Sequence, residues 1–269
     1  MKIGDKMDNE DNIESKTVVH PTLNGLLGII SFSTRIPINR MVTIEEMASS
    51  VVIWPYVGIL IGILGAILSY VSHFFLGLNT MLTAVLIYAF LIWFTGFNHV
   101  DGVMDMGDGL MVHGDSEKRL TVMRDSVVGT GGIATFFIVA SLTLAALSSI
   151  PSQFFIQSVI LMEFASKFSL ISTMVIGKDD TRGIGRLIKS GINSKVLLIL
   201  VIINSIIGYL ILGLPGVCAI IVSVCTGLYL AHMADNKFGC VTGDIMGASN
   251  EIARVTSLII LIIAFNFVI

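Results

Sequence analysis

Long uncharged apolar segments constrain the fold of this chain more than any other feature. A helix needs about 20 apolar residues to cross the hydrocarbon core of a bilayer. Six segments approach or exceed that length, and a shorter seventh ends the chain: 51–76, 80–97, 131–149, 154–176, 196–213, 215–233 and 255–269. The pattern predicts an all-α fold, a polytopic integral membrane helical bundle with about seven transmembrane helices. In the first segment, Gly58 and Gly62 form a small-residue pair that favours close helix packing.

The composition argues against a second, water-soluble domain. Charged residues make up 13% of the chain, whereas soluble domains carry about 25%. Residues 1–19 are polar and contain no apolar core of a signal peptide, which predicts a disordered cytoplasmic tail before one membrane domain, 20–269. Within residues 21–50 a short apolar stretch predicts an interfacial or re-entrant helix, and an eighth span is the alternative. The net charge of −3 is too small to imply a charged partner, and no nucleic acid is expected.

The distribution of basic residues predicts the orientation of the bundle. Outside the N-terminal region, every Lys and Arg except Lys167 falls in three long connections, 98–130, 177–195 and 234–254. These connections all lie on one side of a seven-span bundle, and the positive-inside rule makes that side cytoplasmic. The expected location is therefore the cell membrane, multi-pass, with membrane lipid as a partner and the polar loops in the cytoplasm. A homo-oligomer is compatible with these features.

The stretch "HVDGVMDMGDG" places three aspartates at the end of an apolar segment. Asp101, Asp105 and Asp108 are spaced i, i+4, i+7, which puts them on one helical face if the helix ending at Phe97 continues. Like charges so close repel one another, and a divalent cation such as Mg²⁺ would remove that repulsion. A solvated acidic loop is the alternative. His99 is open to four roles: base, phosphate contact, metal ligand or ordinary hydrogen-bonding residue. The three glycines of the stretch would leave room for a bulky ligand, namely Gly102, Gly107 and Gly109.

The other polar stretches offer further candidates for the same site. "MRDSVVGTGG" contains Arg124, which can pair with a phosphate, and glycines from Gly129 onward that can form an anion-binding nest or a plain turn. "TGDIMGASNE" puts Asp244 and Glu251 seven apart, where they could complete a metal site, orient a hydroxyl group or simply begin a helix. The basic loop around Arg182 could bind a substrate phosphate or contact anionic lipid. Alternatively, its charges could only reflect the membrane topology.

Two charges lie inside the fourth apolar segment. Glu163 and Lys167 are spaced i, i+4 within 154–176. Charges inside a membrane are costly and often functional. They could neutralise each other, or Lys167 could face a cavity and hold a phosphate. Carboxylates that gather Mg²⁺ beside basic residues indicate a substrate with a diphosphate and a phosphoryl-transfer reaction.

Over nearly its whole length the chain resembles the cobalamin synthases, which are adenosylcobinamide-GDP ribazoletransferases. "SFSTRIPINR" resembles the opening of that family, and "HVDGVMDMGDG" resembles its H-x-D-G-x-x-D-x-x-D-G core. "MRDSVVGTGG", the short "GIG" element and "FGCVTGDIMGASNE" follow in the family's order and spacing. Lys167 and Val127 stand where the family pattern expects arginine.

The resemblance implies a Mg²⁺-dependent transfer of the adenosylcobinamide-phosphate moiety of adenosylcobinamide-GDP to α-ribazole or its 5'-phosphate, with release of GMP. It implies catalytic roles for His99, Asp101, Asp105, Asp108, Asp244 and Glu251, the first three aspartates being the metal ligands. It implies substrate binding by Arg124, Asp125, Gly129, Lys167, Arg182, Gly183 and Gly185.

Two rival functions remain at this point. A CDP-alcohol phosphotransferase of phospholipid synthesis would also use D-G-x-x and further aspartates, but it needs Ala-Arg where this chain has Asp105 and Met106. A cation or corrinoid transporter would use the carboxylates as an ion site. It should place ionisable groups in several spans, and the only pair predicted inside a span is Glu163 with Lys167.

Overall fold

The computed structural model describes residues 21–180 and 185–268. The predicted tail, 1–19, and the candidates Arg182 and Gly183 lie outside these residues. The described part is helical, as expected, with these main elements: α1 Leu23–Ser33, α2 Ile44–Ser49, α3 Trp54–Ser69, α4 Thr80–Phe94, α5 Asn98–Met111, α6 Ser116–Met123, α7 Thr130–Ser149, α8 Phe155–Ile176, α9 Gly185–Lys189, α10 Ser194–Leu212, α11 Leu214–Lys237 and α12 Gly243–Val268.

Six helical segments are long and apolar enough to cross a membrane, and α4 with α5 makes a seventh if that bent pair is one crossing. Large apolar side chains also remain exposed along these helices, for example Ile199, Ile202 and Ile206 on α10. Exposed apolar surface of this kind is stable against lipid, whereas water would oppose it. The protein is therefore an integral membrane protein, as the hydropathy predicted.

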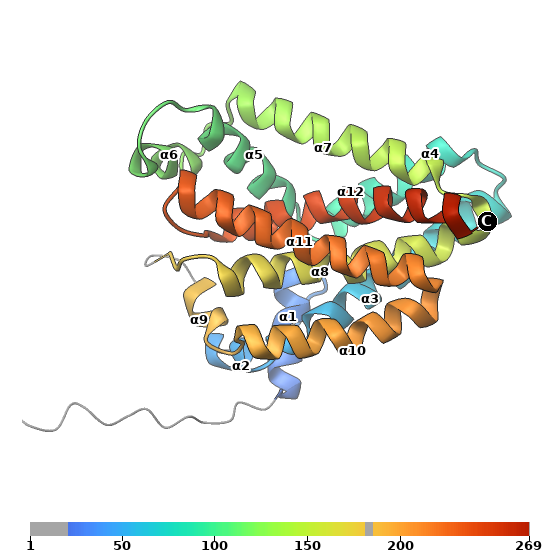
Figure 1. Ribbon diagram of the computed structural model, residues 1–269, viewed down its shortest axis with the longest axis horizontal. Helices are drawn as coiled ribbons and strands as arrows, with labels where there is room; N and C mark the ends of the chain where they lie inside the picture. The colour runs from blue at the N-terminus through green and yellow to red at the C-terminus, as the bar shows by residue number, and fades with distance from the viewer. Residues whose placement is uncertain (1–20, 181–184, 269) are drawn as a thin grey trace, which may run out of the picture.

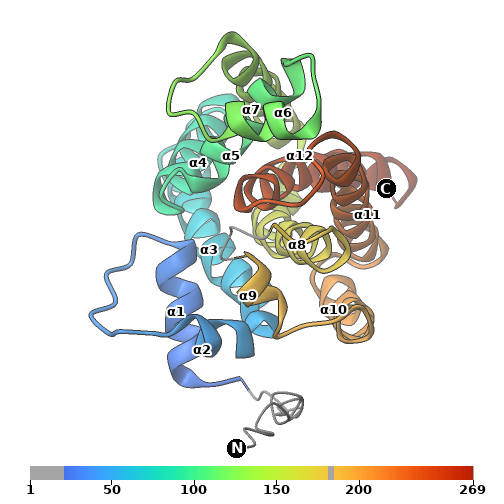
Figure 2. The same cartoon turned by 90° about the vertical axis from the view of Figure 1, so that its left-hand side faces the viewer.

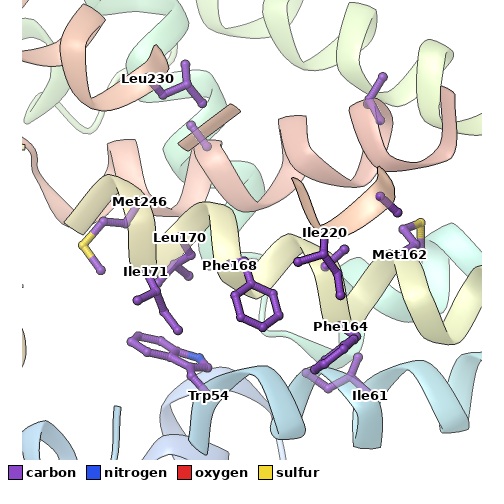
Figure 3. Packing of buried hydrophobic residues seen from close by; sticks show 14 of the residues in the cluster. Trp54, Ile61, Met162, Phe164, Phe168, Leu170, Ile171, Ile220, Leu230 and Met246 are labelled. Carbon is purple, nitrogen blue, oxygen red and sulfur yellow. The ribbon is translucent and has the colours of Figure 1, made fainter. Parts of the chain in front are cut away.

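Helix α8 forms the centre of the bundle. It packs against α3, α11 and α12, and Figure 2 shows it enclosed by them. Its apolar side chains are buried on several sides: Phe164 lies beside Ile61 of α3, and Ile171 lies above Trp54 (Figure 3). The indole N–H of Trp54 donates to Ser33 Oγ at 2.9 Å, so its burial leaves no unpaired donor. Any charge on α8 must therefore find its partner inside the protein.

The long connections gather at one end of the bundle. Figure 1 shows α5, α6, α9 and the turn from α11 to α12 at the left, while the short connections after α7 and α10 and the C-terminus lie at the right. This arrangement agrees with the sequence prediction that the polar connections share one side.

Two sequence predictions about the helices were wrong in detail. The connection predicted at 234–254 is mostly helical: α11 reaches Lys237, and α12 begins at Gly243 instead of 255, so the last span is full-length. The helix predicted to continue past Phe97 bends instead, with an angle of 91° between α4 and α5. Phe97 adopts a left-handed φ of 66° at this bend, following Gly96 at 76°. Polar α5 therefore lies beyond the apolar α4.

The N-terminal apolar segment forms a short helix, α1, of 11 residues. This length is too short to cross a bilayer, so the alternative of an eighth span is not favoured. Thr22 caps α1 by accepting from Gly25 N at 3.0 Å, and the neighbouring α2 packs against α1.

Gly58 and Gly62 pack closely against α8, which confirms the prediction of close helix packing at these glycines. A Cβ atom at Gly58 would lie 2.5 Å from Glu163 O and 2.8 Å from Lys167 Cγ. Gly58→Ala should therefore lower the free energy of unfolding by about 1–3 kcal/mol, because backbone cannot yield as a flexible side chain does. Chemical unfolding in detergent measures this effect. Gly243→Ala is the control, since no atom lies within 4 Å of that added Cβ; equal losses in both variants would contradict the packing argument.

Candidate functional site

Asp101, Asp105 and Asp244 lie near the point where α5 crosses the start of α12. Gly102 makes this crossing possible, because a Cβ at this position would lie 2.3 Å from the carbonyl oxygen of Asp244. Asp101 and Asp105 belong to α5, and Asp244 lies in the first turn of α12. Sequence reasoning predicted that Asp244 could join the aspartates of α5, and the structure places it beside them.

The charges of three neighbouring aspartates act on Asp105. Partial burial, followed by the charges of Asp101, Asp244 and Asp108, raises the pKa of Asp105 to about 7. The carboxylates, which together we call the acidic cluster (Asp101, Asp105, Asp108 and Asp244), are thus close enough to repel one another. A cation would stabilise all of them, which is the physical basis for considering a metal site.

Asp108 has a structural role that the sequence did not reveal. Its Oδ2 accepts from Gly129 N at 2.6 Å and its Oδ1 accepts from Gly132 N at 2.8 Å. Gly129 is the N-cap of α7 and has no side chain to cap the helix. The carboxylate of α5 supplies that cap and also complements the positive end of the helix dipole. The N–H groups predicted to form a nest for a substrate phosphate therefore hold Asp108.

This cap predicts a difference between two aspartates of the same helix. Asp108→Ala should lower the free energy of unfolding by about 1–2 kcal/mol, because it removes both acceptors from the start of α7. Asp101→Ala should leave stability nearly unchanged, since Asp101 is exposed. Thermal unfolding in detergent, with hydrogen exchange across 129–135, checks this. Equal stability of the two variants would show that the cap contributes little.

The remaining glycines of the α5 motif serve packing, which corrects the prediction that they leave room for a ligand. A Cβ at Gly107 would lie 2.5 Å from Thr135 Oγ1 of α7, and one at Gly109 would lie 2.6 Å from Met123 Cγ of α6. Both positions, like Gly102, are buried. Helices therefore fill the space that the sequence left available for a ligand.

The donor set of the acidic cluster fits Mg²⁺ in chemistry, since it consists of carboxylate oxygens. Within residues 21–180 and 185–268, no three acidic, histidine or cysteine side chains converge on one point as a ready-made metal cage. Mg²⁺ is commonly held by one or two carboxylates together with waters and substrate phosphates. Asp101, Asp105 and Asp244 could supply such carboxylates, while each oxygen of Asp108 already accepts a hydrogen bond from the start of α7.

A buried ionic network lies between α8 and α12. Arg254 Nε donates to Glu163 Oε1 at 2.6 Å, and Arg254 Nη1 donates to Glu251 Oε1. Lys167 Nζ lies 3.5 Å from Glu163 Oε2, so the ion pair considered from the sequence is present. All four side chains are fully buried. Two carboxylates thus balance two cations inside the bundle.

Sequence reasoning missed three members of this network. It assigned Arg254 to a loop and overlooked Asn250 and Tyr88. The structure buries Arg254 within α12, so α12 as well as α8 carries charge inside the bundle. The spacing of Asn250, Arg254 and Ser257 at i, i+4, i+7 would have indicated a polar helical face. Tyr88 in α4, which donates to Glu251 Oε2 at 3.3 Å, carries no such signal.

The network reaches the acidic cluster through His99, which precedes Asp101 by two positions. His99 Nδ1 lies 3.1 Å from Asn250 Nδ2 and 3.7 Å from Glu251 Oε1. Burial, followed by the charges of Lys167 and Arg254, lowers the pKa of His99, so its imidazole is neutral. His99 therefore lies next to the fully buried Glu251 and two positions before Asp101 of the acidic cluster.

The remaining candidates lie around α6 and the connection after α8. Arg124 is exposed and donates to Asp180 Oδ2 at 3.1 Å. Asp125 accepts from Val127 N at 3.1 Å in a local turn. A cavity of about 300 Å³ has Arg124 and Asp180 in its lining, but none of the acidic cluster. Gly185 begins α9, near Met246.

Comparison with known proteins gives a consistent assignment. Residues 25–262 match the family described as cobalamin-5-phosphate synthase. An adenosylcobinamide-GDP ribazoletransferase of Methanosarcina mazei is 30% identical over 254 residues, covering 87% of this chain and 90% of that protein. The enzyme of the same name from Picrophilus torridus is 30% identical over 253 residues, covering 91% of this chain and 100% of that protein. No solved structure matches the chain. A match over this much of the sequence shows that the chain belongs to the cobalamin-5-phosphate synthase family.

Proposed function

We propose that this protein is an adenosylcobinamide-GDP ribazoletransferase. The observation that carries the proposal is the family match over residues 25–262, together with relatives of that name that align over most of both chains. In the proposed reaction, the hydroxyl oxygen of α-ribazole, or of its 5'-phosphate, attacks the phosphorus linked to cobinamide. The bond to GMP breaks, the hydroxyl proton is released, and adenosylcobalamin or its 5'-phosphate forms.

The acidic cluster is the proposed centre of this chemistry. Asp101, Asp105 and Asp244 would hold Mg²⁺ against the diphosphate of the substrate. The ion would neutralise phosphate charge and stabilise the charge that develops in transfer. The raised pKa of Asp105 supports this placement, because the neighbouring carboxylates Asp101, Asp244 and Asp108 raise it in addition to partial burial, and a cation would relieve their repulsion. Arg124 would attract the phosphate groups to the same end of the bundle.

The proposed location is the cell membrane, with the acidic cluster on the cytoplasmic face, membrane lipid around the helices and the C-terminus outside. The gathering of the polar connections at one end supports this orientation (Figure 1), because Lys and Arg beside membrane spans favour the cytoplasm. Neither rival function has comparable support: the relatives are named adenosylcobinamide-GDP ribazoletransferases, and the buried charges of α8 and α12 are paired with one another.

The decisive experiment measures GMP release by the protein purified in detergent. Adenosylcobinamide-GDP and Mg²⁺ are supplied with or without α-ribazole, and with or without EDTA. We expect GMP only when both substrates are present, and none with EDTA. A folded protein that releases no GMP, or that releases it without α-ribazole, would overturn the proposed transfer; release that persists in EDTA would overturn the metal alone.

The binding of Mg²⁺ should depend on pH. Because the pKa of Asp105 is raised to about 7, this carboxyl binds a proton below pH 7, and Mg²⁺ must displace it. Affinity should fall by up to about tenfold per pH unit below 7 and level off above. Calorimetric titration with MgCl₂ between pH 5.5 and 8.5 measures this. A constant affinity across the range would place the metal elsewhere.

A further inference from the structure

The amide of Asn250 has only one possible orientation. Its Oδ1 lies 2.7 Å from Lys167 Nζ, and both side chains are buried. An ammonium group donates hydrogen bonds and cannot accept them, so the atom that faces it must be the amide oxygen. Lys167 keeps its charge because Glu163 lies 3.5 Å away and the four buried charges sum to zero. The amide nitrogen of Asn250 therefore faces the opposite way.

That amide nitrogen determines the state of His99. Asn250 Nδ2 lies 3.1 Å from His99 Nδ1, and an amide nitrogen only donates. Nδ1 must therefore accept and carry no hydrogen, since an N–H at this atom would point at the hydrogens of the amide. The proton of the neutral imidazole then resides on Nε2.

The competing arrangement fails on distance. A protonated Nδ1 could turn to Glu251 Oε1, but these atoms are 3.7 Å apart, beyond hydrogen-bond reach. That oxygen also accepts from Arg254. The contact with Asn250 is shorter by 0.6 Å, as the two distances of 3.1 and 3.7 Å show. The geometry therefore favours a single tautomer.

We propose that Lys167 and Asn250 are positioning residues that hold His99 as its Nε2–H tautomer, so that His99 donates a hydrogen bond from Nε2 to a phosphate oxygen of the substrate. In this tautomer Nε2 has no lone pair, and Nδ1 is occupied by Asn250. His99 is then neither the general base nor a metal ligand. The identity of the acceptor rests on the proposed function; the tautomer itself does not.

The tautomer is tested by NMR of the full chain labelled with ¹⁵N-histidine, in detergent, without metal or substrate. The chain has 5 histidines, and the His99 signals are identified as those lost in His99→Gln. We expect a protonated, pyrrole-type Nε2 and an unprotonated, pyridine-type Nδ1 for His99. The reverse pattern in the wild-type protein would overturn the proposal, whatever the variants do.

Variants test the cause of the tautomer. Asn250→Asp presents only acceptors, so Nδ1 should become protonated. Asn236→Asp is a matched control, because Asn236 Nδ2 lies 2.9 Å from Nε2 of another histidine, His232; it should leave the His99 signals unchanged. If Asn250→Asp does not fold, the near-isosteric Asn250→Leu should give signals of both tautomers. An unchanged His99 spectrum in the folded Asn250 variant would overturn the positioning role.

The role of the donor is tested by GMP release. His99→Gln keeps an N–H donor near the position of Nε2, whereas His99→Ala removes it. We expect His99→Ala to lose about 10- to 100-fold in kcat, as for a lost hydrogen bond to a charged group, and His99→Gln to retain most of the activity. Equal losses in the two variants would overturn the donor role. If the NMR result holds but the wild-type protein releases no GMP, the tautomer stands and the proposed function fails.

Discussion

Replacing Asp105 with asparagine should reduce turnover about a thousandfold while the protein still inserts and folds. Metal-assisted charge stabilisation contributes several kcal/mol to such reactions, and about 4 kcal/mol corresponds to a factor of about 10³. Asp105 lies at the centre of the acidic cluster, since its pKa responds to Asp101, Asp244 and Asp108 together. The substitution removes a negative charge from a crowded group, so stability should not fall.

GMP release at saturating substrates, measured across a range of MgCl₂ concentrations, checks this prediction. Glu45→Gln is the control, because Glu45 is an exposed carboxylate on α2 and its loss should not affect turnover. If Asp105→Asn kept the wild-type rate and the wild-type dependence on Mg²⁺, the cluster would not be the metal site. Restoration of turnover by excess Mg²⁺ would instead indicate that Asp105 contributes mainly to metal affinity.

The sequence predicts the apolar part of this fold well, because the bilayer imposes length and hydropathy on each span. It predicts the start of α12 poorly for a related reason. Asp244, Glu251 and Arg254 read as a charged loop, yet they lie in one continuous helix. The charges of Glu251 and Arg254 are balanced together with those of Glu163 and Lys167 of α8, and hydropathy along one segment cannot reveal a partner on another.

In the acidic cluster, too, the sequence predicts one part correctly and misses another. The spacing in α5 correctly predicts a helix with its aspartates on one face, but it cannot distinguish their roles. Asp108 differs from Asp105 because the start of α7 lies against it, with Gly129 N 2.6 Å from its Oδ2. Similarly, the glycines of the motif suggest room for a ligand, whereas the backbone of Asp244 occupies the space beside Gly102. These distinctions depend on contacts between separate helices.

Replacing Arg254 with leucine should have the largest effect on stability. Its guanidinium contacts both Glu163 and Glu251, and all three side chains are fully buried. Removing one partner from a buried ionic network leaves uncompensated charge and typically costs about 3–5 kcal/mol. Lys167, which lies 3.5 Å from Glu163, would then be a single positive charge facing two buried carboxylates. We therefore expect a large loss of folded protein and a much lower midpoint of thermal unfolding in detergent.

A charge-balanced variant separates this electrostatic cause from the loss of packing. Arg254→Leu combined with Glu251→Leu removes one charge of each sign, so the remaining pair, Glu163 with Lys167, stays balanced. If the stability loss is electrostatic, the double variant should recover a substantial part of it, since apolar residues can replace a buried pair at little cost. Arg40→Leu is the control for the substitution itself, because Arg40 is exposed. A double variant as unstable as Arg254→Leu alone would show that the guanidinium stabilises the bundle through its shape and hydrogen bonds, since the charge balance would then be intact.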